Sequence, residues 1–158
     1  MTAGLTRADR RWLALAVRQA HLCPPSRSAF SVGAVIVDGS GRELSRGHSR
    51  EADPVVHAEE SALAKLTPGD PRLRRATLYS SLEPCSRRAS RPCSCTQLIL
   101  AAGIPRVVIA WREPDLFVTD CQGEEILAEA GVVVVECPEM AESAKAPNRH
   151  LLRGGERR

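Results

Sequence analysis

The sequence has 158 residues, of which 43% are apolar and 26% are charged, a composition typical of a globular protein. A chain of this length predicts a single domain, and an aromatic content of only 3% predicts a core built from Ala, Val, Leu and Ile. The net charge of +3 is too small to indicate a nucleic-acid partner by itself. No apolar run approaches the ~18 residues that a membrane-spanning helix needs.

The cysteine content bears on the compartment. Residues 1–11 are polar and charged and lack the apolar core of a signal peptide. Six cysteines without an export signal favour metal binding in a reducing compartment over a disulfide framework. We therefore expect a cytoplasmic protein that binds no membrane.

The first predicted element is a helix that begins at a capping box, Thr6 to Asp9, and stops before Pro24. A β-branched run, the turn 38–41 and a second run predict a hairpin. Alternating helices and strands follow, so we expect an α/β sandwich with a mixed sheet. The expected elements in chain order are a helix over 7–22, strands over 31–37 and 42–48, a helix from 56, a strand over 76–80, a helix over 95–102, a strand over 106–111, a helix over 122–130 and a strand over 132–136.

Two short motifs carry the chemistry. His57 and Glu59 flank one residue, and Cys85 follows a proline and is itself followed by Cys93 and Cys95. One imidazole and two thiolates would give zinc three protein ligands and leave its fourth position to water, whose pKa falls to about 7. A structural zinc site normally has four protein ligands.

Glu59 is badly placed to be that fourth ligand, because residues i and i+2 of a helix point to different faces. It can instead move protons for the water and the substrate. This interpretation predicts that Glu59 protonates a ring nitrogen and then the leaving ammonia. The alternatives are a structural zinc site, or inert thiols beside an ordinary solvated helix start.

The pattern of His57-Ala58-Glu59 followed by Glu83-Pro84-Cys85 and a second cysteine resembles that of the zinc deaminases that act on nucleobases. The chain is similar to the cytidine deaminase superfamily, and most similar to the deaminase half of the bifunctional riboflavin-biosynthesis deaminase/reductases. The segments 95–104 and 148–152 also resemble that family. The resemblance implies a three-layer α/β/α sandwich with a five-stranded mixed sheet and one Zn²⁺ per chain. It divides the chain into a deaminase domain over 1–153 and a basic tail over 154–158.

The spacing of the cysteines departs from the family, which places eight residues between its two zinc cysteines. Cys95 follows Cys85 after nine residues, and Cys93 follows it after seven. We expect His57, Cys85 and Cys95 to be the ligands, because Cys95 keeps the register of the helix that ends at Gly103. Cys93 remains the alternative.

The resemblance also implies a set of substrate-binding residues. Ser31 stands where relatives read the base or ribose, and His48 matches a residue on the phosphate side. Ala58 belongs to the motif around the first ligand. Arg91 matches a basic residue that contacts the substrate phosphate, and arginine suits that task because it pairs with phosphate through two hydrogen bonds. Phe30 is a candidate for packing on a substrate ring or, equally, a core residue.

These features predict a zinc-dependent deaminase of a small, nucleotide-like aminopyrimidine, of the diaminohydroxyphosphoribosylaminopyrimidine type. The alternative within enzymes is a nucleoside or free-base deaminase, which Ser31 and Phe30 favour. Editing of tRNA or single-stranded nucleic acid is disfavoured, because the chain has few aromatic residues to stack on bases. A non-catalytic zinc-binding protein would have no use for Glu59. The family further implies a homo-oligomer, a dimer or tetramer.

Overall fold

A computed structural model of the chain describes residues 4–88, 92–114 and 122–153. Its centre is a five-stranded sheet in the order β2-β1-β3-β4-β5. β1 pairs antiparallel with both β2 and β3, whereas β3, β4 and β5 run parallel. The strands are β1 (Gly33–Val37), β2 (Glu43–His48), β3 (Thr77–Ser80), β4 (Arg106–Ile109) and β5 (Val133–Glu136).

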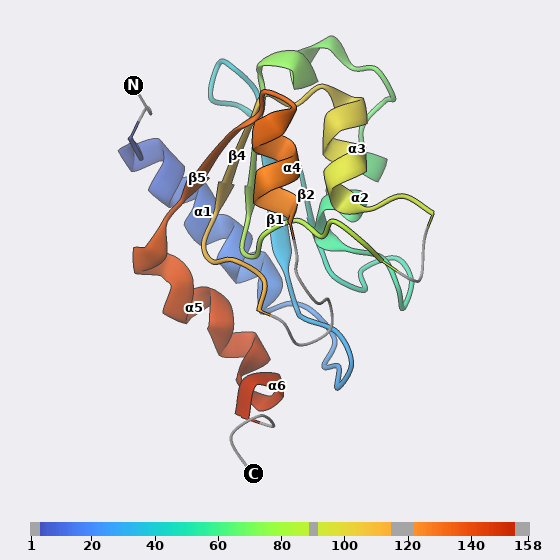
Figure 1. The fold of residues 1–158 in the computed structure, drawn as a ribbon, viewed down its shortest axis with the longest axis vertical. Coiled ribbons are helices and arrows are strands. Elements are labelled where there is room, and N and C mark those ends of the chain that lie inside the picture. The colour runs from blue at the N-terminus through green and yellow to red at the C-terminus, as the bar shows by residue number, and fades with distance from the viewer. Residues whose placement is uncertain (1–3, 89–91, 115–121, 154–158) are drawn as a thin grey trace.

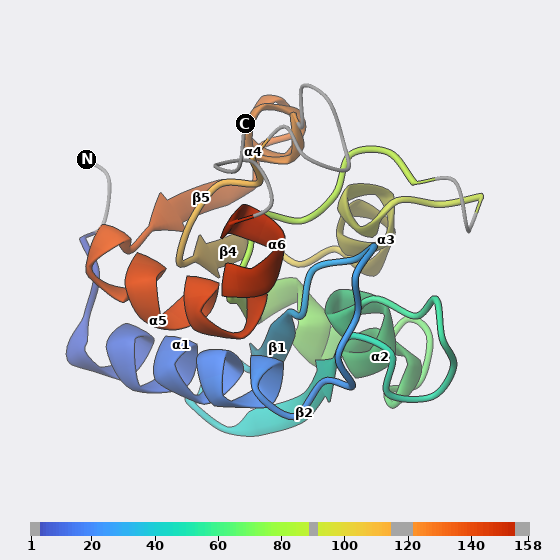
Figure 2. The ribbon, with the colours of Figure 1, turned by 90° about the horizontal axis from the view of Figure 1, so that it is seen from below.

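Helices cover both faces of this sheet (Figures 1 and 2). One face carries α1, α5 and α6, and the other carries α2, α3 and α4. The α/β class and the mixed five-stranded sheet expected from the sequence are therefore confirmed. The helices are α1 (Arg7–Ala20), α2 (Ala58–Ala64), α3 (Cys95–Ala102), α4 (Gly123–Glu129), α5 (Ala141–Lys145) and α6 (Arg149–Arg153).

The core lies where both helical layers press on β1, and every residue of this strand is buried. Two glycines allow the helices to come this close. A Cβ atom on Gly33 would lie 1.9 Å from the carbonyl oxygen of Ala16 in α1, and one on Gly47 would lie 2.8 Å from that of Ala58 in α2. Side chains at these positions would push both helices off the sheet, so the glycines allow α1 to pack closely on β1 and α2 on β2.

The predicted helices and strands lie within two residues of their observed bounds. The short 3₁₀ helix over Pro71–Arg75 is not predicted, and two further features differ. His57 was expected inside the first turn of its helix, but it is the residue before α2 and has an extended backbone. The segment after β5 was assigned no element, yet it forms α5 and α6 with short 3₁₀ turns, and it buries Ala144 and Leu151 against the core. Proline residues interrupt these helices, which hid their periodicity.

A buried ion pair joins α1 to the sheet. Asp9 is only 2% exposed, and its carboxylate accepts hydrogen bonds from Arg106 at 2.8 and 2.9 Å and from the Tyr79 hydroxyl at 2.7 Å. It also completes the predicted capping box with Thr6. Burial alone would raise the pKa of Asp9, but the hydrogen bonds from Arg106, Thr6 and Tyr79 outweigh it and hold this pKa below its usual range.

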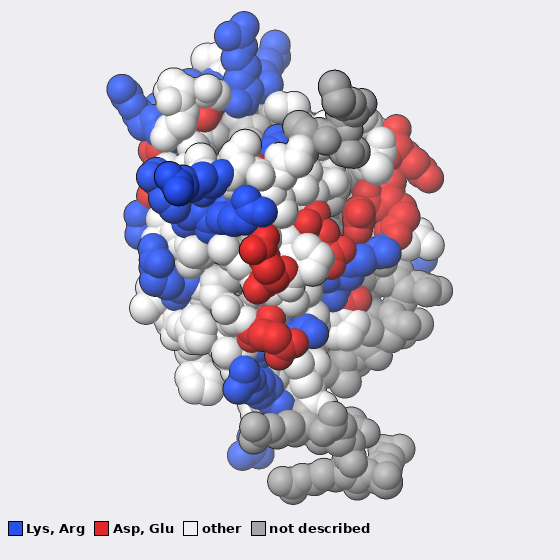
Figure 3. Space-filling model, turned by 90° about the vertical axis from the view of Figure 1, so that its left-hand side faces the viewer, with Lys and Arg blue, Asp and Glu red and all other residues white. Residues whose placement is uncertain are grey.

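The outer face of α1 and α5 carries basic and acidic side chains close together (Figure 3). Arg10 of α1 pairs there with Glu139 at 2.9 Å, an exposed contact. No helix within the described residues is long and apolar enough to cross a membrane. The expected tail over 154–158 lies outside the described residues, and the domain division stays a prediction.

We expect Asp9→Asn to lower the free energy of unfolding by about 3 kcal/mol at neutral pH, because it leaves the Arg106 guanidinium without its charge partner. Urea denaturation followed by circular dichroism measures this loss. Because the folded pKa of Asp9 is depressed, its contribution is full above the unfolded value of about 3.9 and fades as the pH falls below it. The difference between wild type and variant should shrink over the same range.

Glu139→Gln is the matched control, because it breaks the exposed ion pair that Glu139 forms with Arg10 of α1. It should lower the free energy of unfolding by less than about 1 kcal/mol. Equal losses for the two variants would show that the Asp9 pair does not hold α1 to the sheet.

Candidate functional site

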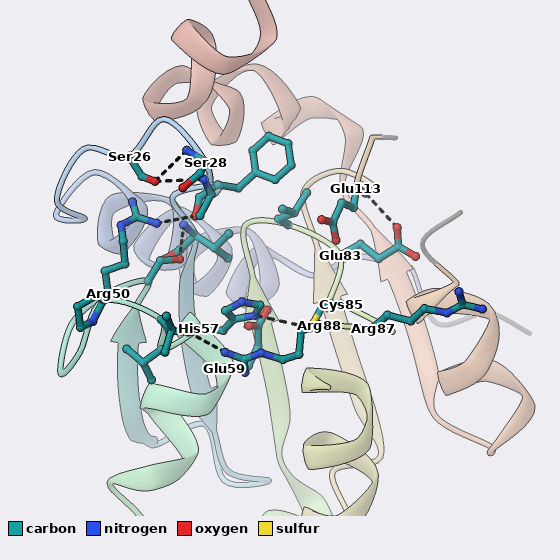
Figure 4. Close-up of a pocket in the computed structure, with 18 residues that line it drawn as sticks. Ser26, Ser28, Arg50, His57, Glu59, Glu83, Cys85, Arg87, Arg88 and Glu113 are labelled. Atoms are coloured by element: carbon teal, nitrogen blue, oxygen red, sulfur yellow. Dashed lines mark hydrogen bonds between the residues drawn. The ribbon is translucent and has the colours of Figure 1, made fainter. Parts of the chain in front are cut away.

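A pocket of about 380 Å³ opens where β3 ends and β1 begins. Four stretches line it: the segment before β1, the loop before α2, the loop after β3, and Glu113. Figure 4 shows His57, Glu59 and Cys85 on its floor and Arg50 at one side. Ligands of α/β proteins commonly bind at the carboxyl ends of parallel strands, which is where this pocket lies.

Three predicted metal ligands converge beside the pocket. The Nδ1 atom of His57 lies 3.6 Å from the Cys85 sulfur and 3.4 Å from the Cys95 sulfur. Tetrahedral zinc, with bonds of ~2.0 Å to nitrogen and ~2.3 Å to sulfur, would hold such atoms about 3.5 Å apart. The donor atoms and their spacing therefore fit one Zn²⁺ ion without rearrangement.

The helix α3 holds the two sulfurs together. Ser94 and Gln97 form its capping box, and Cys95 is its first residue. The backbone N–H of Cys95 donates to the Cys85 sulfur at 3.3 Å, and that of Thr96 donates to the Cys85 carbonyl at 3.1 Å. Such N–H groups at a helix start stabilise a thiolate.

The two thiols therefore differ in acidity. A hydrogen bond from the Cys95 thiol lowers the pKa of Cys85 to about 4, and the hydrogen bond with His57 acts in the same direction. The hydrogen bond with Cys85, together with burial, raises the pKa of the Cys95 thiol. The hydrogen bond therefore favours the ionised form of Cys85 over that of Cys95, and a bound metal ion would displace the remaining proton.

The structure also decides between the two candidate cysteines. Across the described parts of the chain, His57, Cys85 and Cys95 form the one group of side chains arranged to hold a metal ion. Cys95 is fully buried, whereas Cys93 is exposed. The longer spacing between the ligands is taken up in the loop, and the helix register on which the choice of Cys95 rested is kept.

Glu59 lies in the first turn of α2, lines the pocket and is 4% exposed. Its Oε1 atom accepts a hydrogen bond of 2.8 Å from the Ser80 hydroxyl, which also lies 2.7 Å from the carbonyl oxygen of Leu82. Burial raises the pKa of the Glu59 carboxyl. A carboxyl group whose pKa is raised by burial accepts and returns a proton more readily than an exposed one.

Ser80 was not foreseen as a site residue. A serine at the end of a buried strand carries no sequence signal of its own, and only the fold brings it to Glu59. Its hydroxyl restricts the carboxylate to one orientation, facing the pocket.

The residues that the family resemblance assigns to substrate binding are not among the described residues that line the pocket. Ser31 is buried and its hydroxyl accepts a hydrogen bond of 2.7 Å from Arg50, while Ala58 is the buried first residue of α2. His48 turns its Nδ1 atom toward the carbonyl oxygen of Ser49 at 3.1 Å. None of these three is among the described residues that line the pocket, and Arg91 lies outside the described residues. Their roles stay predictions.

Arg87 and Arg88, which follow the first zinc cysteine, point in different directions (Figure 4). The side chain of Arg88 is 3% exposed and donates to Glu60 at 3.0 Å and to the carbonyl oxygen of Val55 at 2.7 Å. Arg88 thereby ties the cysteine loop to the segment before His57. Arg87 is exposed and points away from His57.

Glu83, the first residue of the Glu83-Pro84-Cys85 motif, positions the pocket wall that contains Glu113. Its buried carboxylate accepts hydrogen bonds from the backbone N–H groups of Glu113 at 3.0 Å and Glu124 at 2.9 Å. The Ser86 hydroxyl accepts another from the N–H of Gln122 at 3.1 Å. Residues on both sides of Cys85 therefore anchor the wall formed after β4.

Comparison with known proteins agrees with this site. A protein of Schizosaccharomyces pombe named diaminohydroxyphosphoribosylamino-pyrimidine deaminase is 46% identical over 123 residues, which cover 77% of this chain and 30% of the relative. The chain thus spans about a third of the length of the curated relatives that it matches.

Solved structures show the same fold. The RibD protein of Acinetobacter baumannii superimposes with a TM-score of 0.79 at 27% identity, over 94% of this chain and 40% of that one. A deaminase/reductase of Thermotoga maritima gives 0.75 at 29% identity, over 92% and 40%.

Residues 6–111, well over half of the chain, match the family described as the cytidine and deoxycytidylate deaminase zinc-binding region. This range includes all three metal ligands and Glu59. The chain therefore belongs to the cytidine and deoxycytidylate deaminase family.

Proposed function

We propose that this chain is a zinc-dependent hydrolytic deaminase of a small aminopyrimidine that carries a ribosyl phosphate. The observation that carries the proposal is the meeting of His57, Cys85 and Cys95 within 4.8 Å of one another, with Glu59 lining the same pocket. The S. pombe relative, named for a phosphoribosylaminopyrimidine, supports the substrate class.

The residues divide the reaction between them. Zinc bound by His57 and the two cysteines would act as a Lewis acid that lowers the pKa of a water molecule and makes it a nucleophile. Glu59 accepts a proton from the attacking water and passes it to a ring nitrogen of the substrate. It then takes the second proton from the hydroxyl group that has added to the ring and gives it to the amino group, so that one water is consumed, one C–N bond breaks and ammonia leaves.

The burial of Glu59 favours this proton transfer. The pKa of Glu59 is raised by burial, which makes the protonated state easier to reach during turnover. The Ser80 hydroxyl keeps the carboxylate directed at the pocket. Proton transfer by one positioned carboxyl group commonly contributes on the order of 10²–10⁴-fold to the rate.

A second candidate, deamination of an unphosphorylated nucleoside or base, is favoured by the engagement of two pocket arginines. Arg88 is bonded to Glu60, and Arg50 makes four hydrogen bonds to the segment before β1. Phosphate recognition would then depend on Arg87 and Arg91. The cytoplasmic location and the homo-oligomer expected from the sequence stay predictions.

Ammonia release over a panel of substrates tests the function. The panel pairs the phosphoribosylaminopyrimidine with its dephosphorylated form, beside cytidine, deoxycytidylate, cytosine and guanine. We expect kcat/KM for the phosphorylated aminopyrimidine to exceed that for its dephosphorylated form at least ~10-fold, because an arginine–phosphate pair is lost without the phosphate.

In the same panel Arg91→Ala should reduce kcat/KM for the phosphorylated substrates alone. Preference for an unphosphorylated compound would replace the proposal by the second candidate. No ammonia from any compound, with zinc bound, would refute deamination.

Glu59→Gln should keep about one zinc ion per chain and lower kcat by on the order of 10²–10⁴-fold, because the amide fills the same space but cannot carry the proton. Metal analysis and steady-state ammonia release measure the two quantities. Glu142→Gln, an exposed change on α5, is the control and should alter neither. Undiminished turnover in the Glu59 variant would show that another group transfers the proton.

A further inference from the structure

One wall of the pocket has no regular secondary structure. The segment 24–32 lies between α1 and β1, and its residues Ser26, Ser28, Ala29, Phe30 and Val32 line the pocket. Within the segment the Ser26 hydroxyl accepts hydrogen bonds from the N–H groups of Ser28 and Ala29. These local bonds shape the turn but do not fix its distance from the metal ligands. Other elements must do so.

Arg50 supplies that connection on the pocket side (Figure 4). Its guanidinium donates to the carbonyl oxygen of Pro24 at 2.6 and 3.1 Å, to that of Phe30 at 3.1 Å and to the Ser31 hydroxyl at 2.7 Å. One side chain is therefore hydrogen-bonded to both ends of the segment 24–32, which we call the wall segment. Only the planar, five-donor fork of arginine can make these bonds together, because lysine has a single nitrogen.

The backbone of Arg50 is also constrained, by its conformation and by a hydrogen bond. Its φ of 59° lies in the left-handed region, and it is the one non-glycine residue within the described parts of the chain with a positive φ. A conformation of this kind is kept where the surroundings require it. The N–H of Arg50 donates to the carbonyl oxygen of Val56 at 2.8 Å, immediately before His57. Arg50 therefore links the wall segment to the segment that carries a metal ligand.

The far side of the wall is held independently. Asn148, which is 1% exposed, accepts a hydrogen bond of 2.6 Å from the N–H of Ser31 and donates one of 3.0 Å to its carbonyl oxygen. The Phe30 ring meets Trp111 edge to face, with centroids 5.9 Å apart. The Phe30 ring therefore packs on Trp111 on one side, and Arg50 donates to its backbone carbonyl on the pocket side.

We propose that Arg50 is a positioning residue that sets the width of the substrate slot, by holding Phe30 at a fixed distance from His57 and Glu59. This inference rests on the proposed function, since the slot receives a substrate ring only if the chain is a deaminase. Arg50 acts through Phe30 and touches no reacting atom. Small errors in placing a substrate ring against a catalytic group weaken binding and slow the reaction steeply.

Arg50→Gly is the informative variant, because glycine accepts the positive φ and loses only the side chain. We expect it to bind one zinc ion per chain and to raise KM at least ~10-fold, with a smaller change in kcat. Guanidinium ions at tens of millimolar should restore part of the loss by occupying the vacated space. Arg50→Lys, which keeps the charge, should remain impaired. Arg42→Gly, an exposed arginine in the turn between β1 and β2, should behave as wild type.

A second readout does not depend on activity. In a Trp12→Phe background the tryptophan band of the near-ultraviolet circular dichroism reports on Trp111 alone, and Trp111 contacts Phe30. We expect Arg50→Gly to weaken this signal and guanidinium to recover it. If Arg50→Gly fails to fold, the same measurements on Arg50→Lys decide the matter.

The outcomes separate the two proposals. A wild-type enzyme that releases no ammonia would refute the proposed function, while the Trp111 signal would still test the placement of Phe30. An active enzyme whose KM and Trp111 signal are unchanged by loss of the Arg50 side chain would overturn the inference. Loss of stability with an unchanged KM and no rescue would make Arg50 a structural residue only, which also overturns it.

Discussion

The structure depends on one requirement, that an imidazole and two thiolates from three separate segments meet at one point. His57 stands immediately before α2, Cys85 lies in the loop after β3, and Cys95 begins α3. Both helices must therefore begin at the same edge of the sheet. Gly47 permits this for α2 because it lets the helix lie directly on β2. Around this point the N–H groups of α3 favour the thiolates, and Ser80 and Arg88 fix the groups beside them.

Much of this arrangement could be predicted from the sequence, because the informative patterns are local. Apolar periodicity, the capping box at Thr6 and the glycine at position 103 mark individual elements, and the order of strands and helices then predicts the sheet. The ligands could be predicted because zinc chemistry demands particular residue types at short spacings. Even the choice of Cys95 over Cys93 followed from local helix register.

The remaining parts depend on contacts between residues far apart in the chain. Nothing near Arg50 in the sequence indicates that it reaches back to Pro24, and Asn148 meets Ser31 across 117 positions. Nothing in the sequence indicates that the Ser31 hydroxyl accepts a hydrogen bond from Arg50, and the expected role of Ser31 in reading the substrate stays a prediction. The sequence does not predict α5 and α6, because they are short and interrupted by proline, and their buried residues Ala144 and Leu151 pack into the core. Local motifs therefore identify the metal ligands, whereas tertiary contacts set the pocket walls.

X-ray absorption spectroscopy at the zinc edge tests the central claim most directly, because it counts the atoms bound to the metal. The purified protein should show two sulfur ligands at about 2.3 Å, one imidazole nitrogen at about 2.0 Å and one further light atom from exchangeable solvent. A closed shell of four protein ligands, or a third sulfur contributed by Cys93, would contradict the account, since no position would then remain for a reacting water.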